Sequence, residues 1–466
     1  MGSPPEGAGS PQASWVVPRA IVTPADDLDP IALYAAAREL DLEAALWLQP
    51  AAGFALVGIG RARAIEAEGP DRFAAAAAEW ASLAADLASP AALPRGVGPV
   101  LLGGLGFSPG RPADPAWAGF GAASLVLPRT CWARTSDGSW LTQVAGDAGP
   151  GDTGTQGAGG SVPPFEALAG RSRALAPAPG AVAARPVGAH LVEAGSRPDR
   201  AAWDRLVGLY AGAVGRGRLD KVVLARRLEL RSPIELDVPN ALRRLAASAP
   251  ESTVFAFGRG SRTFLGATPE RLVRSEGRAF ATVALAGSIR RGADAAEDAA
   301  LASALLASEK EREEHGVVVD MLRESLAPLC ESLEVDRGPG VMRLRDVQHL
   351  VTEVRGRLHR QAGMLALAEV IHPTPAVGGE PRDLALELIA EHEGFERGWY
   401  AGPVGWVDVA GDGELAVALR SGIVAGTGAT LFAGCGIVAD SDAGQEWEES
   451  RVKLRTVAGA LGRLDW

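Results

Sequence analysis

The sequence predicts a protein that combines long helices with β-hairpins, and three stretches carry this prediction. Apolar runs at residues 254–258 and 263–266 flank a polar turn, which is typical of a hairpin. Residues 271–274 and 278–285 flank Glu276-Gly277 and predict a second hairpin. Residues 295 to about 326 then contain no proline and a single glycine, so they predict one long helix.

Composition restricts the classes of partner. The formal net charge is -11 over 466 residues, and no run of basic residues interrupts it. We therefore expect no nucleic-acid partner and no anionic membrane partner. The three cysteines are widely spaced and form no metal or redox pattern. The N-terminus lacks the features of a signal peptide, and no apolar run is long enough to span a bilayer, so we expect a cytoplasmic protein.

The chain changes character after about residue 196. Residues 1–14 are mostly Gly, Pro, Ser and Ala, and we expect them to be disordered. Short apolar segments and one helical pattern follow in residues 15–195, with a Gly-rich loop at about 146–164 that we expect to be mobile. No cluster of residues in this N-terminal part suggests chemistry. The candidate chemistry lies in residues 196–466.

The C-terminal helix carries charge on its apolar face. Glu446, Glu449 and Lys453 share a face at three- and four-residue spacing. The same face continues through apolar side chains, namely Val452, Val457, Ala460, Leu461 and Leu464. We therefore expect two carboxylates and an ammonium to face the interior, where an unpaired charge is unfavourable. A structural Glu–Lys ion pair is the simpler interpretation.

Lysine usage favours a chemical role. The chain has 46 lysines and arginines, and only three of them are lysines: Lys221, Lys310 and Lys453. A retained lysine is therefore a candidate for a role that arginine cannot fill, such as losing a proton. Lys221 begins an apolar run typical of a buried strand, where desolvation favours the neutral amine, so it is a candidate base. Glu270 follows Thr268-Pro269 at a strand end and is a candidate acid.

Two further residues lie on predicted elements. Glu314 shares a helix face with Val317, Val318 and Met321, although a solvated charged turn is the simpler interpretation of its surroundings. His349 lies on an alternating strand and is interpreted as a hydrogen-bonded structural histidine.

Hard oxygen ligands without a histidine cluster suit Mg²⁺. The candidate ligands are Glu314, Glu446 and Glu449, while Lys453 and Arg420 could neutralise a substrate carboxylate. From residue types alone, the sequence predicts a Mg²⁺-dependent enzyme that acts on a small carboxylate.

Seven motifs occur in order between about residues 196 and 461. They are Asp220-Lys221-Val222-Val223-Leu224-Ala225-Arg226, Gly266-Ala267-Thr268-Pro269-Glu270, Ala284-Leu285-Ala286-Gly287-Ser288, Val347-Gln348-His349-Leu350, Ile371-His372-Pro373-Thr374-Pro375-Ala376, residues 398–405 and the Glu446/Glu449 helix. Together they resemble the chorismate-utilising enzyme family, specifically its isochorismate synthase branch. The N-terminal part resembles the family only loosely.

The resemblance implies an α+β fold in which large, mostly antiparallel sheets pack together with helices outside. It implies one domain over residues 15–466, with 196–466 as the catalytic part. The implied activity is that of an isomerase, which adds water at C2 of chorismate and removes the C4 hydroxyl. Lys221 would then be the base, Glu270 the acid, and Glu314 and Glu449 the Mg²⁺ ligands, with Glu446 close by. The substrate would be held by residues at or near Ala286, Gly287, Ser288, His372, Tyr400, Gly405, Arg420 and Lys453.

Relatives with other activities are the alternatives. Aminodeoxychorismate-forming relatives carry a lysine nucleophile at the position of Ala286, which cannot act in this way. Anthranilate-forming relatives differ around His372 and need an ammonia-supplying partner, so we expect no amidotransferase subunit and a monomer. Salicylate synthases, which also eliminate pyruvate, are the main alternative, and a non-catalytic chorismate-binding regulator is the second alternative. The sequence leaves open whether the product feeds menaquinone, a siderophore or another compound.

Overall fold

The computed structural model describes residues 19–87, 93–145, 162–177, 189–343, 347–359 and 363–465. The expectation of disorder for residues 1–14 falls outside these ranges, as does most of the predicted loop at 146–164. Among the described residues, no helix is long and apolar enough to cross a membrane.

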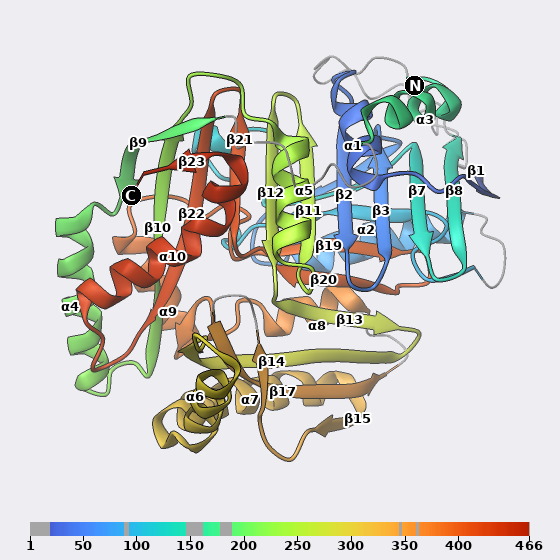
Figure 1. Ribbon diagram of the computed structural model, residues 1–466. Coiled ribbons are helices and arrows are strands. Elements are labelled where there is room, and N and C mark those ends of the chain that lie inside the picture. Colours follow the sequence, from blue (N-terminus) through green and yellow to red (C-terminus); the bar gives the residue numbers. More distant parts are fainter. Residues whose placement is uncertain are drawn as a thin grey trace, which may run out of the picture.

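Two large sheets dominate the structure, and Figure 1 shows the first upright with β13, β14, β15 and β17 of the second below it. The first sheet contains, in spatial order, β1 (Arg19–Pro24), β8 (Gly138–Ala145), β7 (Thr130–Thr135), β3 (Phe54–Ile59), β2 (Ala44–Gln49), β11 (Thr253–Arg259), β12 (Arg262–Thr268), β21 (Ser421–Ala425), β22 (Gly428–Ile437), β10 (Lys221–Arg231), β9 (His190–Arg197) and β23 (Arg463–Leu464), with β18 (Gly379–Glu380) also paired to β10. The second contains β15 (Cys330–Val335), β17 (Val347–Leu358), β14 (Ala279–Arg290), β13 (Arg271–Glu276), β20 (Gly413–Val417), β19 (Pro403–Asp408), β5 (Val100–Leu105), β6 (Ala123–Leu127) and β4 (Arg63–Ala67), with β16 (Gly340–Arg343) also paired to β17. Among the described strands, only the β23–β9 pair is parallel. Both predicted hairpins are confirmed, as β11–β12 and β13–β14.

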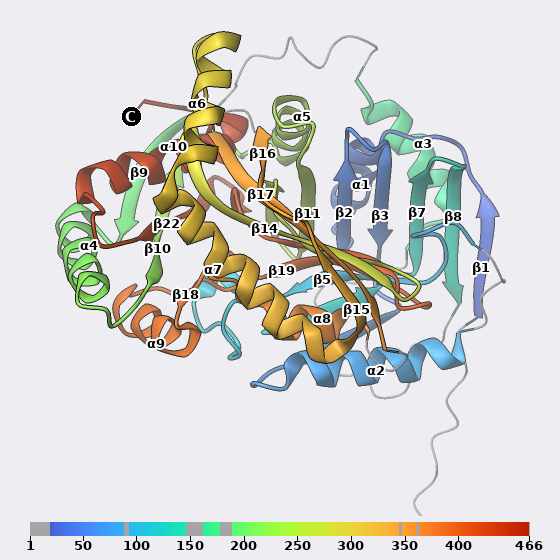
Figure 2. The ribbon, with the colours of Figure 1, turned by 90° about the horizontal axis from the view of Figure 1, so that it is seen from below.

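Helices cover the outer faces of the sheets. They are α1 (Pro30–Arg38), α2 (Arg72–Asp86), α3 (Phe165–Leu175), α4 (Arg200–Gly215), α5 (Val238–Ser248), α6 (Ala295–Ala307), α7 (Glu309–Leu326), α8 (Met364–Ile371), α9 (Arg382–His392) and α10 (Ala443–Leu461), with the short 3-10 helices η1 (Pro115–Trp117) and η3 (Ala327–Leu329). The view from below shows α7 lying along β14 and β17 (Figure 2). The α+β arrangement that the resemblance implied is thus present.

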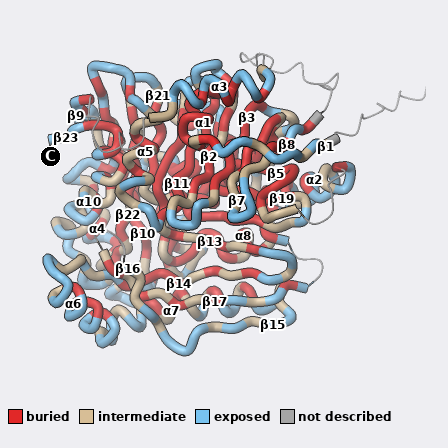
Figure 3. Tube along the Cα trace, turned by 45° about the vertical axis from the view of Figure 1, so that its right-hand side comes forward, coloured by how far each residue is buried: buried red, intermediate tan, exposed pale blue. Residues whose placement is uncertain are grey.

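Alternation along the strands of the first sheet builds two cores. On β11, Phe255 and Phe257 face one apolar cluster, whereas Val254 and Ala256 face the other. The first cluster joins strands of both sheets with helices such as α2, α4, α7 and α8, and the second lies between the first sheet and helices such as α1, α5 and α10. Burial is accordingly continuous along these central strands, while the peripheral helices are exposed on one side (Figure 3).

The single long helix predicted over residues 295–326 is wrong, because Ser308 divides it. Ser308 has an extended backbone, and its hydroxyl accepts a hydrogen bond from the backbone N–H of Glu311 at 3.3 Å. A serine in this position caps a new helix, and a glutamate three residues later is a known signature of such a start. The chain therefore turns between α6 and α7, which changes the direction in which Glu314 points.

The predicted apolar face of the C-terminal helix is only partly confirmed. Val457, Ala460 and Leu461 are buried, whereas Val452 is 39% exposed. Leu464 lies beyond the helix, in β23. The interior face is thus restricted to the second half of α10, and the first half borders an open cavity.

Candidate active site

A cavity of about 270 Å³ lies where one end of β10 and β22 meets β14 and the helices α7 and α10. Its wall is formed by Lys221, Val223, Pro269, Glu270, Leu285, Ala286, Gly287, Ser288, Lys310, Glu311, Glu314, His349, Ala376, Val377, Tyr400, Ala401, Leu419, Arg420, Phe432, Ala433, Gly434, Gly436, Val438, Glu446, Glu449 and Lys453. The pairing of β10 with β22 and of β14 with β17 brings these segments together from across the C-terminal part of the chain.

Lys221, the first residue of β10, extends over the neighbouring strand. A Cβ atom at Gly436 on β22 would lie 2.2 Å from Lys221 Cε, so glycine at this position leaves room for the lysine chain. The Lys221 side chain is 14% exposed, and its ammonium donates a hydrogen bond to Glu314 Oε1 on α7. In the structure, Lys221 is therefore ion-paired with a carboxylate. For Lys221 to act as a base, Glu314 must be engaged elsewhere.

Glu270 occupies the short connection between β12 and β13. Its backbone N–H donates to Thr268 Oγ1 at 3.2 Å, and its carbonyl accepts from the backbone N–H of Val417 at 2.9 Å, so the main chain is fixed on both sides. Burial raises the pKa of Glu270 from 4.5 to about 7, although the charges of Lys221, Lys453 and Arg420 act in the opposite direction. A substantial fraction of this carboxyl is therefore protonated at neutral pH.

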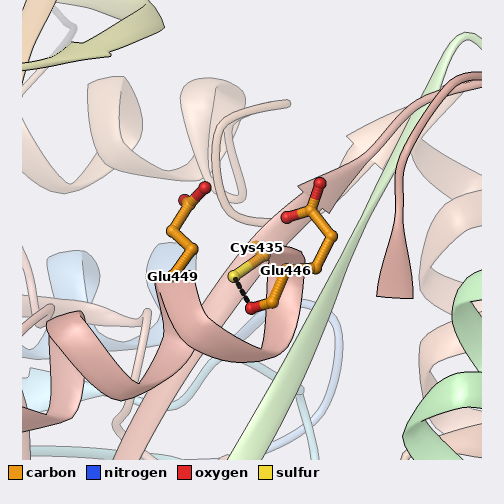
Figure 4. A group of neighbouring side chains, drawn as sticks. All are labelled: Cys435, Glu446 and Glu449. Atoms are coloured by element: carbon orange, nitrogen blue, oxygen red, sulfur yellow. Dashed lines mark hydrogen bonds between the residues drawn. The ribbon is translucent and has the colours of Figure 1, made fainter. Parts of the chain in front are cut away.

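Glu446 and Glu449 lie on consecutive turns at the start of α10, with Cys435 of β22 between them (Figure 4). One ligand atom of each of the three residues lies within 4.8 Å of the others. Burial and then the charge of Glu449 raise the pKa of Glu446. Lys453 lies 2.6 Å from Glu449 and holds the pKa of that carboxyl below its usual value.

These donors suit a hard divalent cation. Two neighbouring carboxylates repel one another, and a cation between them would relieve that repulsion. Cys435 is a soft donor, burial raises the pKa of its thiol, and its Sγ already donates to the Glu446 carbonyl at 3.3 Å. Glu446 and Glu449 can therefore hold Mg²⁺ through oxygen, with Glu314 on a second wall of the same cavity.

Six of the eight predicted substrate-binding residues line the cavity: Ala286, Gly287, Ser288, Tyr400, Arg420 and Lys453. Gly287 interrupts the pairing of β14 with β17, and its φ of 75° is one that glycine adopts readily. The irregularity frees the backbone N–H of Ser288, which donates to Glu311 Oε2 at 2.8 Å. Ala286 is buried and presents only a methyl group, so this position offers no nucleophile.

His372 and Gly405 do not line the cavity, so the structure adds no support to their prediction as substrate-binding residues. The His372 ring is 5% exposed and lies about 6 Å from the rings of Phe73 (6.1 Å) and Phe107 (6.0 Å), so it belongs to the core. Its loop nevertheless supplies Ala376 and Val377 to the wall. Gly405 lies within β19, where a Cβ atom would come 2.0 Å from the Glu414 carbonyl oxygen of β20. Close strand packing, and not a ligand, requires glycine there.

Glu311 and His349 are ionisable cavity residues that were not predicted as site residues. Glu311 precedes Glu314 by one turn of α7, with the same three-residue spacing as Glu446 and Glu449, and this repeated spacing was a signal available in the sequence. His349 was interpreted as structural, and its Nδ1 does have a partner in Ser288 Oγ at 2.7 Å. It also faces the cavity, and burial lowers its pKa to about 4, so its ring is neutral.

Comparison with known proteins identifies the family. Residues 16–462 match the model of the chorismate binding enzyme family. The chain belongs to this family. Its sequence is 38% identical to the salicylate biosynthesis isochorismate synthase of Pseudomonas aeruginosa, over 94% of this chain and 90% of that protein. It is 35% identical to isochorismate synthase MenF of Bacillus subtilis, over 78% and 75% of the two chains.

Solved structures agree with this assignment. The fold matches that of MenF, the menaquinone-specific isochorismate synthase from Escherichia coli, with a TM-score of 0.74 and 27% identity over 95% of this chain and 94% of that one. Anthranilate synthase component I from Streptococcus pneumoniae shares the fold at a TM-score of 0.67 and 22% identity. Family and relatives place the chain in the isochorismate synthase branch.

Proposed function

We propose that this protein is an isochorismate synthase that converts chorismate to isochorismate with Mg²⁺. The observation that carries the proposal is that one cavity holds both Lys221 and Glu270, and burial raises the pKa of Glu270 to about 7. A reaction that adds water at one carbon and expels a hydroxyl from another needs a base and an acid at the same time.

Proton transfer by the two residues balances the reaction. Neutral Lys221 accepts a proton from water as the oxygen bonds to C2 of chorismate, and the ring double bonds shift. The bond from C4 to its hydroxyl breaks, and Glu270 gives its proton to the departing oxygen, which leaves as water. The protein then carries an ammonium and a carboxylate, and transfer of a proton between them through solvent restores the starting state.

Positive groups on two walls suit the two carboxylates of chorismate. Lys453 and Arg420 both border the cavity, and Lys453 is fixed by donating to the Gly434 carbonyl at 2.7 Å. Mg²⁺ held by Glu446, Glu449 and Glu314 would supply a further positive charge for a substrate carboxylate. Recruitment of Glu314 by the ion would also withdraw that carboxylate from Lys221 and leave the amine free to act.

Product analysis tests the function directly. The full-length protein is incubated with chorismate and Mg²⁺, and the mixture is followed by NMR and a pyruvate assay. We expect isochorismate to accumulate toward an equilibrium mixture with little pyruvate. Stoichiometric salicylate and pyruvate near neutral pH would assign the chain to the salicylate synthase type instead. Binding of chorismate without any turnover would favour the regulator.

A further inference from the structure

We propose that a hollow at the opposite end of β10 binds a small carboxylate with an apolar body and thereby regulates the enzyme. This hollow has a volume of about 210 Å³. It is lined by Pro115, Ala116, Arg227, Glu229, Leu230, Arg231, Arg262, Ile423, Ala425, Gly428, Ala429 and Thr430. It shares no lining residue with the catalytic cavity.

Strand register explains why a hollow forms here. Arg262 of β12 pairs with Ala425 of β21, which pairs with Gly428 of β22, which pairs with Arg231 of β10. Directly opposed residues of neighbouring strands project from the same face of a sheet. Two long arginine side chains therefore flank a floor made of a methyl group and a glycine. The Arg231 guanidinium leans over this floor, because its Nη1 lies 3.3 Å from where a Cβ at Gly428 would be.

The charge in the hollow is unbalanced. Arg227 is already paired, with Asp114 and, at 2.9 Å, with Glu229. Arg231 and Arg262, in contrast, make no side-chain hydrogen bond or ion pair with any residue in the described ranges. Two uncompensated guanidinium groups facing one small hollow are notable in a chain with a net charge of -11. They suit a carboxylate, which arginine binds through parallel hydrogen bonds.

The remaining residues that line the hollow indicate that the part of the ligand beyond its carboxylate is apolar. Pro115 and Ala116 of η1 form one side, and Ile423 adds apolar surface. An inorganic anion would leave this surface in contact with water, whereas a carboxylate attached to a ring or short aliphatic body would cover it. Thr430 adds a hydroxyl that can bond a polar substituent.

A stack of three aromatic rings links the hollow to the catalytic cavity. Trp117, next to Ala116, stacks on Phe432 with ring centroids 5.6 Å apart, and Phe432 stacks on Tyr400 at 5.3 Å. Phe432 and Tyr400 line the catalytic cavity. A ligand that contacts η1 can thus change the packing of two residues of the catalytic cavity. On β10, the nearest lining residues of the two sites, Val223 and Arg227, are about 13 Å apart. The proposal that this hollow binds a ligand does not depend on the proposed isomerase activity. The proposal that the ligand regulates the enzyme rests on that activity.

Calorimetry on the full-length protein provides the test, with benzoate as the carboxylate probe and inorganic phosphate as the simple anion. We expect one benzoate site with a Kd below about 1 mM. The double variant R231Q/R262Q should weaken benzoate binding at least tenfold and keep the basal rate of chorismate conversion within twofold. Arg205→Gln, which removes an exposed arginine on α4, is the matched control and should bind benzoate normally.

Kinetics complete the test. In the wild type, saturating benzoate should change kcat for chorismate at least twofold, and R231Q/R262Q should abolish this change. Benzoate that only competes with chorismate, and binds R231Q/R262Q as well as the wild type, would place the probe in the catalytic cavity and overturn the proposal. If benzoate does not bind, or if phosphate binds and benzoate does not, the proposal that the hollow binds a carboxylate with an apolar body is wrong. Because calorimetry needs no turnover, a protein without isomerase activity would still report on the binding site.

Discussion

At the scale of single residues, the ion pair between Lys221 and Glu314 makes arginine the informative substitution. An arginine in place of Lys221 would keep the charge and the partner on α7 but could not release a proton. We expect Lys221→Arg and Lys221→Ala each to lower kcat at least about 100-fold, the usual magnitude for loss of a general base. Chorismate binding and the melting temperature should change little.

Lys310→Arg is the control for this experiment. Lys310 also borders the cavity, but its ammonium is half-exposed and pairs with Asp440 at 2.6 Å, a role that arginine can fill. Its variant should retain turnover within a few-fold. A Lys221→Arg enzyme of near-normal rate would show that the base lies elsewhere.

The pKa of Glu270 predicts both activity and stability as functions of pH. As the pH rises through about 7, the acid loses its proton, so kcat should fall on the alkaline side. Its folded pKa lies above the value of 4.5 for a free carboxyl, so the folded state binds more protons between these values and stability falls as the pH rises. Glu270→Gln should therefore abolish turnover. The free energy of unfolding of this variant, relative to that of the wild type, should rise by up to about 3 kcal/mol between pH 5 and pH 8.

Chemical denaturation at several pH values measures this effect. Glu313→Gln, an exposed position on the same protein, should leave the pH dependence of unfolding unchanged. A wild-type kcat that does not fall on the alkaline side, or a Glu270→Gln protein with wild-type pH dependence of stability, would contradict the assignment.

Sequence reasoning located most of this chemistry because the motifs include the reacting side chains. Lys221 and Glu270 line one cavity, and each lies next to the end of a strand that the hydrophobic pattern makes visible. His372 and Gly405 do not line it, because membership of a motif does not say where a residue lies in the fold. Both serve packing, and only the three-dimensional neighbours Phe107 and Glu414 reveal it.

At the scale of elements, the first turn of α10 is held from behind by a buried arginine. Arg226 is 1% exposed, and its guanidinium carbon lies 3.7 Å from the centroid of the Trp447 ring. Its Nε and Nη1 have no hydrogen-bond partner among the described residues, so stacking is its main compensation for desolvation. Trp203 adds a hydrogen bond from its ring to the Ala443 carbonyl at 3.1 Å. These contacts fix the turn that presents Glu446 to the cavity.

Loss of this support should weaken Mg²⁺ binding. We expect Arg226→Met to raise the Mg²⁺ concentration needed for half-maximal thermal stabilisation about tenfold, equivalent to about 1.4 kcal/mol. Glu449→Gln and Glu314→Gln should do the same by removing a ligand directly, and activity should fall with them. Arg95→Met is the matched control, because Arg95 stacks on Trp406 at 4.4 Å in the second sheet. It should lower the melting temperature without altering the Mg²⁺ dependence, and an Arg226→Met protein that behaves in the same way would refute the positioning role.

Helix boundaries were less predictable than helix existence. Residues 295–326 contain no proline and a single glycine, so nothing in that composition marked the break between α6 and α7. A serine followed by Glu311 was the one local signal of a new helix start. The exposure of Val452 was not predictable, because it depends on which other elements cover α10, and no local pattern records them.

At the scale of the whole molecule, the N-terminal part completes both sheets. β2 pairs with β11, which sets Trp47 opposite Phe255, and β5 pairs with β19, which sets Leu102 opposite Trp406. These partners are about 200 and 300 residues apart in the chain, and no local pattern records such pairings. The sequence therefore predicted strands, but not the pairing of N-terminal strands with C-terminal ones.

Because N-terminal strands pair with C-terminal strands in both sheets, we expect residues 15–466 to unfold as one unit. Trp47 is fully buried in the apolar cluster that joins strands of both sheets, so Trp47→Ala should destabilise the protein by about 3–5 kcal/mol, although the residue lies far from the cavity in sequence. In urea, tryptophan fluorescence and far-ultraviolet circular dichroism should then shift together to a lower midpoint with a single transition. Expression of residues 196–466 alone should give an insoluble or unfolded product, because β11 and β19 would each lose a partner strand and become sheet edges. A soluble, active 196–466 fragment, or two separate transitions in the full chain, would show instead that the N-terminal strands form an independent domain.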